Sequence, residues 1–407
     1  MVNVDGAKTC FDGADGEKKP MSGWSSLPPL GLYIHLPWCV QKCPYCDFNS
    51  HELRLDMSEA GYITALLADL DFELSLAAIQ GRELQSLFIG GGTPSLFSAD
   101  SIDQLLEGVR QRITCAPGME VTLEANPGTL EQGRYQGYRQ AGVNRLSIGV
   151  QSFHSDSLAR LGRIHGRDEV FEAIESARGA RFDSINLDLM CGLPGQSMAM
   201  ACADVELALA AAPEHLSYYQ LTIEPNTAFH HKLPRAMPSD DTAGDIQAAG
   251  CRLLEAAGYI QYEVSAYMRE GYACQHNLNY WRFGDYIGIG AGAHGKLTNA
   301  LTGCIERSWR VKRPEAYMAG AGSAAAVSGR RELDSSDRLI EFLMNALRLK
   351  AGFEVGLFTE RTGLVEADLW SRLEGLLEQG LLVHHDGRVK TSETGWIFLD
   401  DVVAALL

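Results

Sequence analysis

The chain has 407 residues, of which 46% are apolar and 21% are charged, as in ordinary soluble globular proteins. This length predicts two or three domains and excludes a small scaffold held together by disulfides. The 35 Lys and Arg residues are outnumbered by 52 Asp and Glu residues, and the net charge of −17 argues against broad, non-specific binding to nucleic acid or anionic membranes.

Residues 1–29 are rich in Gly, Asp, Lys, Ser and Pro, and we predict that they form a flexible tail. The start of the chain lacks the charged segment, apolar stretch and cleavage site of a signal peptide, and no apolar run of about 18 residues follows. We therefore expect a protein of the reducing cytoplasm.

From residue 30, short apolar runs alternate with longer segments of helical spacing. Strands are expected at residues 31–36, 86–89, 120–124, 145–150, 184–190 and 215–223, and helices at residues 58–79, 99–113, 129–141, 168–180 and 198–211. Such alternation predicts an α/β fold with parallel βαβ units, wound into a partial β/α barrel of about six strands over residues 30–265.

Residues 266–330 are rich in Gly and aromatic side chains, and we expect them to form a connecting segment that contributes to a site. Helices are then expected at residues 337–349 and 366–379, followed by strands at 381–384 and 389–391 around Asp386-Gly387. This order predicts a small, mostly helical, winged-helix-like domain over residues 331–407. Its few basic residues argue against nucleic acid as a partner.

Three of the ten cysteines gather directly after the first predicted strand, at Cys39, Cys43 and Cys46. In a reducing compartment, clustered thiols are better interpreted as metal ligands than as disulfides. A [4Fe–4S] cluster usually takes four Cys ligands, so three would leave one iron open to a chelating cofactor. The alternative is a Cys₃His zinc site, with His35 or His51 as the fourth ligand.

A CxxxCxxC motif at the end of a first barrel strand resembles the radical S-adenosylmethionine (SAM) superfamily, and so does the glycine-rich run Gly90-Gly91-Gly92-Thr93-Pro94 after the next strand. In that family the open iron binds the amino and carboxylate groups of SAM, and an electron cleaves SAM to a 5′-deoxyadenosyl radical. Glycines would let backbone amides approach the SAM carboxylate closely.

Polar residues also follow later strands, where parallel β/α barrels build their sites. These motifs are similar to the coproporphyrinogen oxidase-like branch of the superfamily. The resemblance implies that SAM is bound by Tyr33, Tyr45, Gly91, Gly92, Thr93, Glu124, Gln151, Arg163 and Asp188. Arg163 would neutralise a carboxylate, while Glu124 and Asp188 would bind an ammonium group or ribose hydroxyls.

Two functions share these motifs: the oxygen-independent coproporphyrinogen III oxidase, which decarboxylates two propionates, and the heme chaperone HemW family. The oxidase pattern has a further cysteine two residues after the third, whereas this chain has Phe48 there. The run from His276 to Trp281, HNLNYW, matches the HNxxYW motif of the heme chaperones. The resemblance implies that His276 ligates heme, with aromatic neighbours that shield the porphyrin.

Phe48 and the HNxxYW motif each have a purely structural alternative. Phe48 could pack against the first helix, and His276 could be a hydrogen-bonded core residue. Other candidate heme ligands are His35, His230, His231 and His294. We predict a heme chaperone with a [4Fe–4S] cluster, SAM and heme as cofactors and no assigned catalytic residue. Its expected partners are acceptor hemoproteins such as respiratory cytochromes, and peripheral membrane contact stays open. The alternatives are the oxidase or another radical SAM enzyme.

Overall fold

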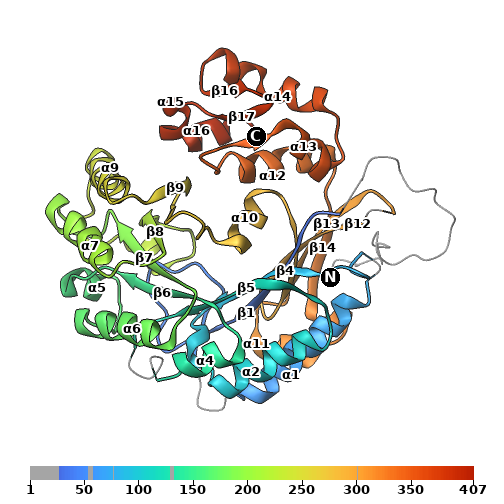
Figure 1. The fold of residues 1–407 in the computed structure, drawn as a ribbon, viewed down its shortest axis with the longest axis horizontal. Coiled ribbons are helices and arrows are strands. Elements are labelled where there is room, and N and C mark those ends of the chain that lie inside the picture. Colours follow the sequence, from blue (N-terminus) through green and yellow to red (C-terminus); the bar gives the residue numbers. More distant parts are fainter. Residues whose placement is uncertain (1–26, 54–57, 77, 129–132, 300) are drawn as a thin grey trace.

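The computed structural model describes residues 27–53, 58–76, 78–128, 133–299 and 301–407 (Figure 1). Most of the predicted tail and the first residues of the helix expected at 129–141 lie outside these described residues.

The predicted α/β fold is confirmed, with parallel strands in chain order and helices on the convex side of the sheet (Figure 1). The strands are β1 (Leu30–Leu36), β4 (Leu84–Gly91), β5 (Cys115–Ala125), β6 (Arg145–Gln151), β7 (Ser184–Cys191) and β8 (His215–Gln220). The helices between and after them are α1 (Glu59–Leu74), α2 (Ala99–Arg110), α4 (Tyr135–Ala141), α5 (Ser155–Arg160), α6 (Arg167–Ala180), α7 (Met198–Ala210), α8 (Ala228–His231) and α9 (Asp240–Ala256).

Burial explains this arrangement. Strand β6 is buried along its whole length, as expected for a parallel strand covered on both faces. Helix α2 buries Ile102, Leu105 and Val109 on one stripe, and the Ser98 side chain accepts a hydrogen bond from the Ser101 amide at its start. The strands and the inner faces of the helices share one hydrophobic core.

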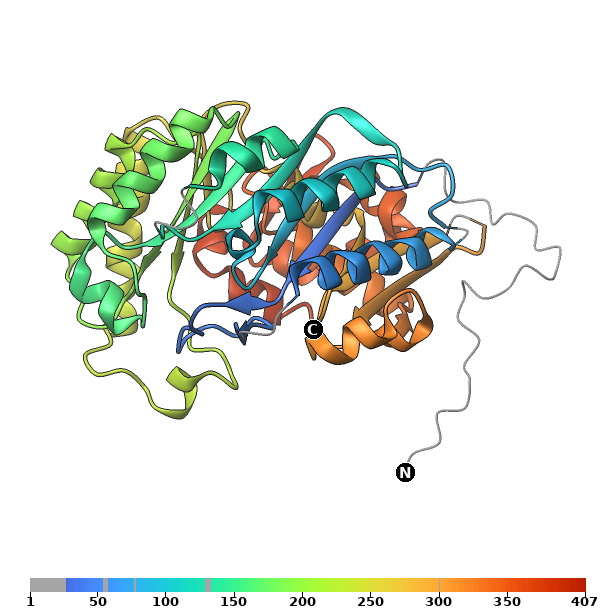
Figure 2. The same cartoon turned by 90° about the horizontal axis from the view of Figure 1, so that it is seen from below.

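The sheet extends beyond the six predicted strands at both edges. Strand β11 (Asp285–Ile289) pairs in parallel with β1, and β12 (His294–Asn299), β13 (Cys304–Arg310) and β14 (Val327–Glu332) follow in antiparallel order. At the other edge lie β10 (Ala266–Met268) and β9 (Ile260–Glu263). These twelve strands form an open sheet, whose two ends lie far apart in the view from below (Figure 2). The added strands cover the edge of β1, which would otherwise expose unpaired backbone groups.

The C-terminal region packs on the concave side of the barrel (Figure 1). It contains α12 (Ser335–Ala346), β15 (Phe353–Glu354), α13 (Val355–Thr362), α14 (Glu366–Glu378), β16 (Leu382–His385), β17 (Arg388–Thr391), α15 (Glu393–Ile397) and α16 (Leu399–Ala404). Asp386 and Gly387, with φ of 50° and 72°, form the turn between β16 and β17. The hydrophobic core of this region also takes in Ile305 from β13 and Phe283 from the turn before β11.

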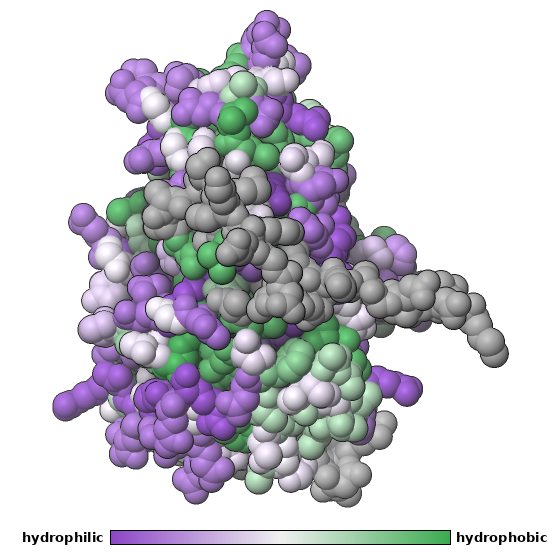
Figure 3. Space-filling model, turned by 90° about the vertical axis from the view of Figure 1, so that its right-hand side faces the viewer, coloured by the Kyte–Doolittle hydropathy of each residue, from purple (hydrophilic) through white to green (hydrophobic). Residues whose placement is uncertain are grey.

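Helix α10 (Gln275–Trp281) lies between the barrel and the C-terminal region, where it contacts β1, β4 and α12 (Figure 1). Hydrophilic residues and smaller apolar patches are interspersed on the face shown in Figure 3. Within the described residues, no helix combines the length and apolar character needed to cross a membrane.

Candidate cofactor site at the mouth of the barrel

A cavity of about 360 Å³, named here the cofactor cavity, opens at the carboxyl ends of the barrel strands. It brings together most of the predicted site residues: Cys39, Cys43, Tyr45, Cys46, Gly91, Gly92, Thr93, Glu124, Gln151, Arg163 and Asp188. Two predicted residues, Tyr33 and His276, do not line it. The shared edge of parallel strands explains how residues so distant in sequence meet.

The glycine-rich turn is bound tightly to the cysteine loop. The amide of Gly92 donates a hydrogen bond to the Leu36 carbonyl oxygen at 2.8 Å, and the amide of Thr93 donates one to the Trp38 carbonyl oxygen at 2.7 Å. A Cβ atom on Gly92 would lie 2.5 Å from that Trp38 oxygen, so a larger residue would push the loop away. The turn therefore fixes the position of the cysteines.

Gly91 has a φ of 117°, which favours glycine, and a Cβ there would lie 2.5 Å from the His35 ring. Its amide donates a hydrogen bond to Glu124 Oε2 at 3.1 Å. The amides of the turn are thus engaged within the chain, whereas the sequence led us to expect them at a cofactor carboxylate. In this conformation the glycines allow close packing of the protein itself.

The three thiols are free and partly exposed. Burial raises the pKa of the Cys39 and Cys46 thiols, because removal from water disfavours the thiolate. A bound cation reverses this preference, since metal ligation requires the thiolate form. The donor set, three thiols at a polar cavity, therefore fits an iron–sulfur cluster.

Of the two histidines proposed as zinc ligands, His35 has both ring nitrogens engaged, whereas His51 has only Nε2 engaged within the described residues. The Nδ1 and Nε2 atoms of His35 lie 3.0 Å from the Tyr33 hydroxyl and 2.9 Å from the Asn49 carbonyl oxygen. The Nε2 atom of His51 is engaged by Asn49 Oδ1 and the Lys312 carbonyl oxygen. Among the residues whose positions are described, no three His, Cys, Asp or Glu side chains surround one ion. An iron–sulfur cluster does not require its ligands to surround a single ion, because each thiolate binds a different iron atom.

Two half-buried carboxylates, of Glu124 and Asp188, face the cofactor cavity. The pKa of Glu124 is raised to about 7, first by burial and then by the negative charge of Asp188, against the opposing effect of the Gly91 hydrogen bond. Asp188 accepts hydrogen bonds from Asn186 Nδ2 at 2.7 Å and Ser147 Oγ at 3.3 Å. Burial raises its pKa as well. The pair is therefore suited to a ligand that donates protons or carries positive charge.

Gln151, the last residue of β6, has a left-handed backbone with φ of 66°. This conformation is uncommon for a residue other than glycine and costs free energy that the surrounding structure must supply. The side chain accepts a hydrogen bond from the Tyr219 hydroxyl at 2.9 Å. The bond aligns Gln151 along the cavity wall.

Arg163 reaches the cavity through a residue that the sequence reasoning did not select. Its Nη1 atom donates to Asn126 Oδ1 at 3.0 Å, and Asn126 Nδ2 donates to Thr93 Oγ1 at 3.1 Å. The Arg163 Nε atom is buried without a hydrogen-bond partner in the described structure. Asn126 lies two positions after Glu124, at the end of the same strand. This position at a strand end is the feature of the sequence from which Asn126 could have been predicted as a site residue. Other unselected lining residues are Gln41, Ser147, Ser217, Tyr219 and Asn277.

His276 lies behind the cavity, on α10, with 1% of its surface exposed. Its Nδ1 and Nε2 atoms are each 2.9 Å from a hydroxyl oxygen, of Ser86 and Tyr280 respectively. Burial lowers its pKa to about 3, so the ring is neutral. Because both nitrogens are engaged, ligation of heme iron by His276 stays a prediction that requires one of these bonds to break.

Tyr33 lies below the cavity, where its hydroxyl meets His35, and Phe48 lies at the rim. Phe48 is 60% exposed, so it does not pack into the protein as one alternative supposed. His230, His231 and His294 are exposed and line no described part of the cavity.

Comparison with known proteins gives two family matches, the radical SAM superfamily over residues 33–208 and the HemN C-terminal domain over residues 333–398. The heme chaperone HemW of Escherichia coli strain K12 is 49% identical over 381 residues, which cover 94% of this chain and 99% of that protein. The heme chaperone HemW of Mycobacterium tuberculosis strain H37Rv is 34% identical, with 95% and 97% covered.

Among solved structures, the coproporphyrinogen III oxidase (HemN) from Escherichia coli, a radical SAM enzyme, has a TM-score of 0.78. The match covers 93% of this chain and 90% of the oxidase at 21% sequence identity. The two proteins share the fold.

Proposed function

Because the chain belongs to the heme chaperone HemW family of the radical SAM superfamily, we propose that it binds heme and transfers it to acceptor hemoproteins. The observation that carries this proposal is the coverage of the sequence similarity, since 49% identity to the Escherichia coli protein extends over nearly all of both chains. The likeness includes both the barrel and the C-terminal region.

We further propose that Cys39, Cys43 and Cys46 hold a [4Fe–4S] cluster and that SAM occupies the cofactor cavity. When bound, the cluster supplies an electron and an iron with open coordination sites. The Nε atom of Arg163, which lacks a hydrogen-bond partner in the described structure, supports a role in binding the SAM carboxylate. The half-buried pair Glu124 and Asp188 supports binding of an ammonium group or ribose hydroxyls. Glu124 also holds the Gly91 amide and so keeps the turn in place.

The oxidase alternative is not favoured. The likeness to coproporphyrinogen III oxidase at 21% identity concerns the fold alone. Phe48 occupies the position of the extra oxidase cysteine, and its exposed ring at the cavity rim offers no ligand. We therefore expect heme binding without decarboxylation of coproporphyrinogen III.

As acceptors we propose respiratory cytochromes, which the protein would approach from the cytoplasm. The test is direct transfer: the chain is loaded with heme, separated from free heme, and mixed with the apo form of a b-type cytochrome. The account expects the absorbance of the holo-cytochrome to develop faster than with free heme passing from serum albumin, a non-specific heme carrier. Heme that stays on the chain, or leaves it no faster than from albumin, would contradict a chaperone role.

A further inference from the structure

We propose that the cleft between α10 and the C-terminal region binds the two carboxylates of an amphipathic ligand through Arg282 and Arg361. The identity of that ligand rests on the proposed function, under which the carboxylates are the propionates of heme. Two adjoining cavities of about 510 and 420 Å³, together named the arginine cleft, share Leu278, Arg282 and Arg361 in their walls. Such volumes suit a cofactor-sized ligand.

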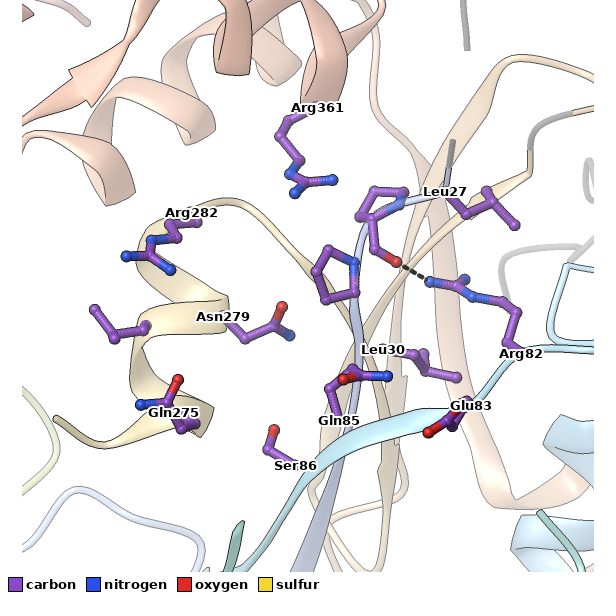
Figure 4. A pocket seen from close by; sticks show the side chains of 13 residues that line it. Leu27, Leu30, Arg82, Glu83, Gln85, Ser86, Gln275, Asn279, Arg282 and Arg361 are labelled. Carbon is purple, nitrogen blue, oxygen red and sulfur yellow. Dashed lines mark hydrogen bonds between the residues drawn. The ribbon is translucent and has the colours of Figure 1, made fainter. Parts of the chain in front are cut away.

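Arg361 is the strongest evidence for an anion. It projects from α13 into the larger cavity (Figure 4), yet only 9% of its surface is exposed. Its buried Nε and Nη1 atoms make no hydrogen bond within the described structure, although Nη1 lies 3.2 Å from the Glu360 carboxylate. Burying a cation with unsatisfied donors costs free energy, which a bound carboxylate would offset.

Arg282, directly after α10, adds a second positive charge. Its side chain is exposed and forms no ion pair or hydrogen bond with the described residues. Burial lowers the pKa of Arg361, the charges of Glu360 and Asp285 oppose this shift, and the charge of Arg282 adds to it because the two guanidinium groups repel each other. A dianion between them would remove this repulsion and accept bidentate hydrogen bonds.

A third arginine in the larger cavity has a different role. Arg82 Nη1 lies 2.8 Å from Asp285 Oδ2, and its Nη2 donates to the Pro28 carbonyl oxygen (Figure 4). In the smaller cavity, Arg388 pairs with Glu354 at 2.7 Å. These two arginines are compensated within the protein.

The smaller cavity supplies the apolar part of the site. Met268, Leu278, Phe353 and Leu357 line it beside Arg282 and Arg361. An apolar wall next to two guanidinium groups, of which Arg361 keeps buried donors without hydrogen bonds, matches a ligand with an apolar body and two carboxylates at one edge.

The site is also close to the predicted heme ligand. Ser86, which hydrogen-bonds His276, lines the larger cavity beside Gln275 (Figure 4). The imidazole therefore lies one side chain behind the wall of the larger cavity.

The test is titration of the full chain with heme and with heme dimethyl ester, followed by Soret absorbance. R282Q and R361Q are compared with wild type and with R252Q, which removes the same charge from an exposed position on α9. We expect wild type and R252Q to prefer heme over the ester, and each cleft variant to bind heme about tenfold more weakly with unchanged affinity for the ester.

Wild-type affinity for heme in both cleft variants, or equal affinity of wild type for heme and ester, would overturn the site alone. A wild-type chain that binds neither ligand would instead overturn the proposed function and, with it, this assignment. The melting temperature separates a structural role: R361Q should melt no lower than wild type, because the variant removes a cation with unsatisfied donors. If R361Q misfolds, R282Q still tests the proposal, because Arg282 is exposed and its replacement should not disturb folding.

Discussion

Cys43 lies in the cofactor cavity between the two other cysteines of the loop, and the cluster assignment makes it one of three ligands. Replacing Cys43 with Ser should abolish normal cluster assembly, because a hydroxyl is a poor substitute for a thiolate on iron. Heme binding is expected to survive, since the arginine cleft is built from other residues. Absorbance and electron paramagnetic resonance after anaerobic reconstitution check this, with C202S on α7 as control. An unchanged cluster spectrum in C43S would refute the assignment.

His276 tests the two interpretations of the HNxxYW motif. H276A should shift the Soret band and weaken heme binding if the imidazole ligates iron. It should also lower the free energy of unfolding by about 1–3 kcal/mol, because the Ser86 and Tyr280 hydroxyls lose their buried partner. The control is Y280F, which removes one hydrogen bond of the ring and keeps both nitrogens. If H276A loses stability but binds heme with a wild-type spectrum, His276 is a core residue only.

The raised pKa of Glu124 predicts how the stability of the fold depends on pH. Its pKa is about 7 in the folded protein against 4.5 for an ordinary Glu, so the folded chain binds more protons than the unfolded chain between these values. The contribution of Glu124 to the free energy of unfolding should therefore be greatest below pH 4.5. It should fall by roughly 3 kcal/mol as the pH rises to 7.

E124Q should remove this contribution, because an amide does not ionise. Urea denaturation of the cofactor-free protein at pH 5 and pH 7.5 measures the difference. The expected result is a smaller loss of stability with pH in E124Q than in wild type. Equal losses in both proteins would show that Glu124 ionises as freely in the folded state as in water.

At the scale of elements, α10 is held by a carboxylate from another part of the chain. Glu120, in β5, accepts hydrogen bonds from the amides of Gln275 and His276, both at 3.1 Å. This contact caps the start of the helix that separates the cofactor cavity, lined by Asn277, from the arginine cleft, lined by Leu278. We infer that Glu120 positions the HNxxYW segment.

E120A should loosen α10 by about 1 kcal/mol, the usual cost of a lost helix cap. Hydrogen exchange should speed up at residues 275–281 while β6 keeps its protection, and heme affinity should fall with it. E120Q, which keeps an acceptor oxygen, serves as the matched variant and should lie between wild type and E120A. Exchange in E120A that matches wild type would contradict the capping role.

Strands buried on both faces could be predicted from sequence because their apolar runs are continuous, as in β6. Strand β11 was not predicted: residues 285–289 include Gly288 and gain their place only by pairing with β1, which is distant in sequence. Asn126 was missed for a related reason, since its value comes from bridging Thr93 and Arg163. Local patterns predicted the elements, and contacts between elements determined the rest.

On the scale of the whole molecule, α10 places two different chemistries side by side. The cofactor cavity has thiols and half-buried carboxylates at the barrel mouth, and the arginine cleft has guanidinium groups beside apolar walls. A ligand in the arginine cleft would thus contact α10, the helix that also borders the proposed SAM site.

The central claim is that this fold carries heme and does not oxidise a porphyrinogen. One preparation of the anaerobically reconstituted protein should be titrated with heme and, in parallel, supplied with coproporphyrinogen III, SAM and a reductant. The account predicts stoichiometric heme binding and no protoporphyrinogen product. Efficient decarboxylation without specific heme binding would contradict it and identify the protein as an oxidase.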